Sequence, residues 1–174
     1  MRNPNRMSHS ELLLDSFGRI RDAVHGAVDG LTLEDLTFQP DSRANSISWL
    51  VWHLTRIQDD HMADLAGTSQ VWTSAGWAER FGLHLDVSDT GYGHGPLQVA
   101  SVAAPAEVLG GYHDAVHEAT VPFLLRVSDV DLDRIVDEHW DPPVTMGVRL
   151  VSILSDDLQH AGQAAYIRGM IERR

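Results

Sequence analysis

Apolar side chains recur at intervals of three or four residues in four long stretches of the chain. This spacing is typical of amphipathic helices, because it gathers the apolar side chains on one helix face. It predicts helices over residues 10–28, 46–66, 105–124 and 147–171. The last stretch is apolar almost all round, which predicts that its helix is well buried. Four long helices predict an all-α fold, an up-down four-helix bundle.

The connection between the second and third predicted helices combines many glycines with aromatic residues. Glycines interrupt regular structure, so residues 68–104 are predicted to form a long ordered loop with one short helix near residues 77–81. We expect residues 71–95 to cover the open side of the metal site described below and to shape its substrate pocket. The alternative is that their aromatic side chains cap the bundle or contact a second subunit, as in a homodimer. These side chains are Trp72, Trp77, Phe81 and Tyr92.

The rest of the chain predicts one domain. Residues 129–146 read as a connector with a short strand pair over 134–137 and 144–146. We find no internal repeat, low-complexity tract or linker that would divide the chain. The whole of residues 1–174 is therefore expected to form a single domain.

Composition excludes several classes of function. The chain has 13 basic residues, all of them arginine, against 25 acidic ones, and a formal net charge of −12. Such a chain is repelled by phosphate backbones and anionic lipid surfaces, which argues against nucleic-acid and membrane binding. It has no cysteine, which excludes disulfides, a thiolate nucleophile and cysteine-ligated metals. With no targeting signal and no apolar run long enough to span a membrane, a cytoplasmic location is expected.

Two helices carry residues that bind metals in other proteins. His53 lies in the second predicted helix, within residues 49–54, at the margin of the apolar face. Alone, it is more simply explained as a buried histidine with one hydrogen bond. In the last helix, Asp156 and His160 are four residues apart. This spacing puts both side chains on one face, about 5–6 Å apart at Cβ, as two ligands of one metal require. A solvated polar stripe would give the same pattern.

Together, the three residues indicate a metal site more strongly than His53 or the Asp156–His160 pair does alone. Metal sites in helix bundles are built from side chains on facing helices. His53, Asp156 and His160 would supply three ligands and leave positions open for water or substrate, as in catalytic sites. Imidazole and carboxylate ligands suit Zn²⁺, Ni²⁺ or Fe²⁺ and do not distinguish among them. Because the imidazoles must be neutral to bind, we expect metal affinity to weaken below about pH 6.

Other polar residues near this pattern are weaker candidates. His94 lies in the glycine-rich segment 91–95. We predict that it is a catalytic residue on a loop that folds over the metal, the alternative being an exposed histidine. Asp60 and Asp64 follow His53 on its helix and either could orient it.

The third predicted helix carries a pair of histidines of its own. His113 and His117 are four residues apart and form either a second metal pair or, as we prefer, a surface pair. The preference rests on the lack of a third ligand nearby in the sequence.

Three short motifs carry a resemblance to a known family. They are Trp52-His53-Leu54, the D-x-x-x-H-x-G-Q segment 156–163, and Tyr166-Ile-Arg-Gly169. In helix order, the whole chain resembles the DinB-like superfamily of metal-binding four-helix bundles. It looks closest to the branch of mycothiol-dependent maleylpyruvate isomerase and the bacillithiol or mycothiol S-transferases. The resemblance implies one divalent metal held by His53, Asp156 and His160, where many members have histidine in place of the aspartate.

The resemblance also implies a reaction. The expected function is metal-dependent transferase or isomerase chemistry with a low-molecular-weight thiol, such as mycothiol, acting on a small electrophilic molecule. The metal would favour the thiolate at neutral pH. The alternative is a non-enzymatic metal- or ligand-binding bundle related to stress responses.

Overall fold

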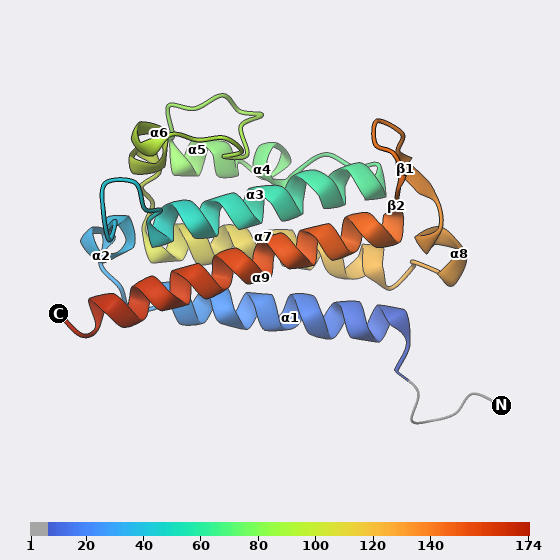
Figure 1. Cartoon of the computed structure of the whole chain (residues 1–174), viewed down its shortest axis with the longest axis horizontal. Coiled ribbons are helices and arrows are strands. Elements are labelled where there is room, and N and C mark those ends of the chain that lie inside the picture. The colour runs from blue at the N-terminus through green and yellow to red at the C-terminus, as the bar shows by residue number, and fades with distance from the viewer. Residues whose placement is uncertain (1–6) are drawn as a thin grey trace.

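Four long helices form the body of the protein in the computed structural model, which describes residues 7–174 (Figure 1). They are α1 (His9–Val28), α3 (Ile47–Ala66), α7 (Ala106–Leu124) and α9 (Met146–Ile171). Their bounds agree with the apolar periodicity to within one or two residues. The shorter elements are α2 (Leu33–Thr37), α4 (Val71–Ser74), α5 (Trp77–Phe81), α6 (Pro96–Ser101), α8 (Asp129–Leu132), β1 (Ile135–Asp137) and β2 (Val144–Thr145).

Local sequence signals set the helix ends. Ser8 caps α1 and forms a reciprocal pair of hydrogen bonds with Glu11, which satisfies backbone N–H groups that have no partner within the helix. The side chain of Ser46 accepts a hydrogen bond from a backbone N–H in the first turn of α3. Gly67 ends α3 with φ of +66°, a left-handed conformation that glycine adopts without strain. The all-α bundle predicted from the sequence is confirmed.

The helices do not alternate strictly in direction, as an up-down bundle would. Near the starts of α3 and α7, the backbone N–H of Ala104 donates to Ser48 Oγ at 3.0 Å. Further along both helices, Gln58 donates to Thr120 Oγ1 at 3.0 Å. Residue numbers therefore increase together along the two helices, so α3 and α7 run parallel. The connection 67–105 makes this possible by returning the chain to the end of the bundle where α3 begins (Figure 1).

This connection contains α4, α5 and α6, and so has more helix than predicted. Asp59 of α3 anchors its first part by accepting hydrogen bonds from the backbone N–H of Trp72 at 2.7 Å and from Tyr112 Oη at 2.8 Å. The rings of Trp72, Trp77 and Phe81 then pack 5.2–5.7 Å from the Tyr112 ring. These aromatic side chains therefore cover α7 of the bundle, as in the alternative interpretation, and the pocket role of residues 71–95 stays a prediction.

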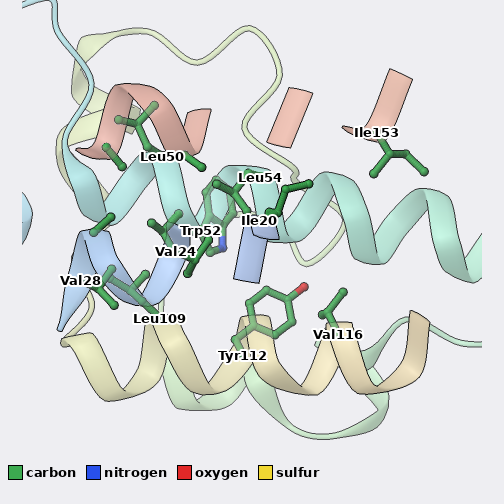
Figure 2. Packing of buried hydrophobic residues seen from close by; sticks show 14 of the residues in the cluster. Ile20, Val24, Val28, Leu50, Trp52, Leu54, Leu109, Tyr112, Val116 and Ile153 are labelled. Carbon is green, nitrogen blue, oxygen red and sulfur yellow. The ribbon is translucent and has the colours of Figure 1, made fainter. Parts of the chain in front are cut away.

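The core is shared by all four long helices, and Figure 2 shows side chains of α1, α3, α7 and α9 meeting in it. α9 packs against α1 and α3, which covers only one of its faces. Its apolar residues on the other side stay in solvent, with Val148 53%, Val151 63% and Leu158 53% exposed. The prediction that this helix is well buried is thus wrong for this face. Its buried positions are Met146, Leu150, Ile153, Asp157, Ala161, Ala164 and Ile167.

The remaining predicted element is also present. β1 and β2 pair antiparallel, with an irregularity between Ile135 and Asp137, and close the connector ahead of α9. Across residues 7–174, no helix is long and apolar enough to cross a membrane.

Candidate metal centre

The three residues singled out in the sequence lie together between α3 and α9. His53 comes from α3, and Asp156 and His160 come from one face of α9. One ligand atom of each residue lies within 4.8 Å of the others. Asp156 Oδ2 is 3.9 Å from His53 Nε2, and Asp156 Oδ1 is 3.6 Å from His160 Nε2. Three potential ligands therefore surround one point, with His53 buried and the other two half-buried.

Both imidazole rings are held in the form that a metal ligand needs. His53 Nδ1 donates to the backbone carbonyl of Thr90 at 2.5 Å, and His160 Nδ1 donates to Gln163 Oε1 at 3.0 Å. An oxygen that only accepts requires the proton to be on Nδ1. The lone pair of each ring is therefore on Nε2, the atom that faces Asp156. Acceptors of this kind fix the orientation of metal-binding histidines in known sites.

The carboxylate gives a separate reason to expect a cation. Asp156 Oδ2 is buried and has no hydrogen-bond partner among the described residues. Burying an unpaired carboxylate oxygen is unfavourable, and a bound cation would compensate it. Two imidazoles and one carboxylate form a donor set that fits Zn²⁺, Ni²⁺ or Fe²⁺. Within residues 7–174, no other three histidine or acidic side chains form such a group.

The two histidines differ in how readily they take up a proton. Burial lowers the pKa of His53 below its usual value of 6.5, and this outweighs the Thr90 carbonyl and Asp156. Burial also opposes a charge on His160, but the Asp156 carboxylate and the Gln163 side chain outweigh it and raise the pKa of His160 above 6.5. In the metal-free site, His160 is therefore the first ligand to be protonated as the pH falls.

As the pH is lowered, metal affinity is accordingly expected to start falling at a higher pH than the reference pKa of imidazole indicates. Protons compete for His160 Nε2 from above pH 6.5, and affinity should then drop about tenfold per pH unit. His53 adds a second competing proton only at lower pH. Competition against a chelating dye between about pH 8 and about pH 5 measures this dependence. Constant affinity over that range would contradict the assignment of His160 as a ligand.

The segment that supports His53 comes from the connection between α3 and α7. A Cβ atom on Gly91 would lie 2.8 Å from His53 Nδ1 and 3.0 Å from Trp52, and its φ is +92°. The chain thus reaches His53 closely enough for the Thr90 carbonyl only because residue 91 is glycine. No sequence pattern pointed to this backbone carbonyl. The role of Gln163 had a weak signal, since it follows His160 by three residues.

His94 lies behind Trp49, and so further from the potential metal ligands than predicted. Its side chain is 2% exposed, and its Nδ1 accepts a hydrogen bond from Trp49 Nε1 at 3.0 Å. Its Nε2 donates to the carboxylate of Asp89 at 2.9 Å. The Trp49 ring in turn stacks on His53 at 4.6 Å. This geometry favours a role in positioning the Trp49–His53 pair, while direct contact of His94 with substrate stays a prediction.

The two aspartates considered as supports for His53 lie elsewhere. Asp60 accepts a hydrogen bond from Gln70 at 2.6 Å, and Asp64 is exposed. Neither forms a hydrogen bond with His53 in the described part of the chain, where His53 Nδ1 bonds to the Thr90 carbonyl instead. The neighbour of Asp156 is the more unusual acid. Asp157 is fully buried, and burial raises its pKa well above the usual value.

The second histidine pair is not a surface pair. His113 is fully buried and its Nδ1 donates to Thr55 Oγ1 at 3.2 Å. Burial lowers its pKa to about 3, so it is neutral. His117 is half-buried, and in the described residues no third potential ligand joins the pair. The preference for the surface was wrong for His113, because α7 turns this residue towards α3.

Comparison with known proteins agrees with this picture. A family model described as mycothiol-S-transferase matches residues 12–173. A solved structure, the conserved protein of locus from Enterococcus faecalis, is 29% identical with a TM-score of 0.90, and the match covers 97% of this chain and 100% of that one. No protein with curated function matches the sequence. The family model spans nearly the whole bundle and includes both helical segments that carry the potential metal ligands. The DinB-like resemblance is therefore confirmed, and the chain belongs to the mycothiol S-transferase family.

Proposed function

We propose that the protein transfers a low-molecular-weight thiol, mycothiol or a close analogue, to a small electrophilic molecule in a divalent-metal-dependent reaction. The family match supports a thiol co-substrate and a transfer reaction. The convergence of His53, Asp156 and His160, with both Nε2 lone pairs directed to one point, is the observation that carries the proposal. The chain has no cysteine of its own, so the sulfur must come from a co-substrate.

The residues of the site would have separate roles in this reaction. His53, Asp156 and His160 would hold the cation, and fewer than a full set of protein ligands would leave room for the sulfur. A divalent cation supplies a Lewis acid that favours the thiolate form at neutral pH. Trp49 closes the site beside His53 and His160, at ring distances of 4.6 and 6.1 Å, and so limits access of water on that side.

Two measurements on one preparation test the proposal. Metal content is determined on protein purified without a polyhistidine tag, and thiol transfer is then followed with mycothiol and monochlorobimane, which loses chloride as the carbon–sulfur bond forms. Transfer that needs both metal and thiol supports the proposal. Stoichiometric metal without transfer to any electrophile tested would favour the alternative, a non-enzymatic metal-binding bundle.

His94 is expected to matter for turnover more than for metal content. His94→Ala removes the acceptor of the Trp49 indole N–H and a partner of Asp89, so the Trp49–His53 pair loses its support. We expect about one metal per chain to remain and kcat to fall about tenfold, the lower end of effects seen for residues that support ligands. His94→Asn should recover part of the rate, because its amide oxygen can accept from the indole. Metal loss in step with activity would contradict this positioning role.

A further inference from the structure

A cleft of about 690 Å³ lies beside the metal centre. One wall is the segment 40–45 that leads into α3, and the other is the surface of α9 from Leu158 to Ile167. Gly162 belongs to the α9 wall, and a Cβ atom there would meet nothing within 4 Å. The volume falls in the range of small-molecule sites, about 300–1,000 Å³. None of its lining residues comes from the connection 67–105, where the sequence led us to expect the pocket.

The cleft and the metal centre share a side chain. Gln163 lines the cleft, and its Oε1 accepts from the Nδ1 of the metal-site residue His160. Its Nε2 has no partner among the described residues and can donate into the cleft. Leu50, in the floor of the cleft, lies one helical turn before His53. A molecule in the cleft that contacts Gln163 would therefore lie within a side-chain length of His160.

The chemistry of the lining favours a ligand rich in hydroxyl groups. No acidic residue lines the cleft, although the chain carries a net charge of −12. Arg43 and the amide of Asn45 have no side-chain partner in residues 7–174, and Gln159 adds an amide oxygen, since its amide nitrogen already donates to Ser155. Amides offer donors and acceptors together, as hydroxyl groups do. The Tyr166 ring, 69% exposed, offers an apolar face of the kind that sugar rings pack against.

We propose that this cleft binds the hydroxyl-rich part of the thiol co-substrate, as in the amino-sugar and cyclitol portion of mycothiol, while the sulfur extends to the metal centre. The inference rests on the proposed function and deepens it. It assigns recognition of the thiol to α9 and the segment 40–45, whereas His53, Asp156 and His160 act on the sulfur alone.

The test uses S-methylmycothiol, which has the hydroxyl-rich part but no free thiol, and measures its binding to the metal-loaded protein by calorimetry. Gly162→Leu should weaken binding by about tenfold or more by filling the cleft, with Gly162→Ala intermediate. Neither change should lower helix stability, because alanine and leucine are better helix formers than glycine. Gly26→Leu is the matched control, since Gly26 is exposed on α1 with nothing within 4 Å of its Cβ position.

The outcomes separate this inference from the proposed function. Equal affinity of wild type and Gly162→Leu for S-methylmycothiol would overturn the cleft assignment, even if thiol transfer is found. Tighter binding of S-methylglutathione, which carries carboxylates and no sugar, would overturn the preference for a hydroxyl-rich ligand. Binding that depends on Gly162 in a protein without transferase activity would sink only the proposed function. In the active enzyme, Gly162→Leu should raise KM for mycothiol.

Discussion

Replacing His160 with alanine is expected to remove the metal while the protein stays helical. The substitution deletes one of three ligand atoms and leaves His53 and Asp156 with an incomplete site. Loss of a ligand should exceed the 10–100-fold drop in affinity typical of residues that only support ligands, so we expect a drop of at least about 100-fold. His53→Ala should behave similarly. Metal content after dialysis, measured by atomic spectroscopy, and far-ultraviolet circular dichroism give the two readouts.

His84→Ala provides the matched control for this result. His84 is exposed in the connection between α3 and α7 and belongs to no potential metal-binding group. Its replacement should leave one metal per chain. If the His53→Ala and His160→Ala proteins keep the stoichiometry of wild type, the three-residue centre is refuted. Loss of helical signal in the His160→Ala protein would call for His160→Gln, which keeps the size of the side chain better.

Gly91→Ala is expected to damage the metal centre without changing any ligand. The new Cβ would lie 2.8 Å from His53 Nδ1, 3.0 Å from Trp52 and 3.2 Å from Trp49, all of which are held in the core. The segment must then move away, taking with it the Thr90 carbonyl that fixes the tautomer of His53. We expect metal affinity to fall about 10–100-fold. The free energy of unfolding should fall by about 1–3 kcal/mol from the clash and the positive φ.

Gly93→Ala separates the clash from the backbone strain. Gly93 lies in the same segment with a φ of +77°, but nothing lies within 4 Å of its Cβ position. The Gly93→Ala protein should lose stability through backbone strain alone and keep its metal affinity. Chemical denaturation and metal titration of both variants make the comparison. Equal metal affinity in the two variants would show that the Thr90 contact does not control His53.

The parts of the protein that the sequence by itself determined are those governed by local physics. Helical periodicity placed α1, α3, α7 and α9, and Ser46 and Gly67 set the ends of α3 because their side chain and backbone conformation act within one turn. The same periodicity brought Asp156 and His160 to one face of α9. For these features, the residues that interact are at most four positions apart.

The meeting of His53 with this pair was decided only by the tertiary structure, because it requires α3 and α9 to pack at one particular register. The same holds for the Thr90 carbonyl, which has no side chain to leave a signal and acts across 37 positions of the chain. The parallel course of α3 and α7 depends on where the connection 67–105 ends. This parallel packing places His113 of α7 against Thr55 of α3. Apolar periodicity shows that a helix has a buried face, but the neighbours that cover it, and hence which residues of α9 stay in solvent, depend on the path of the whole chain.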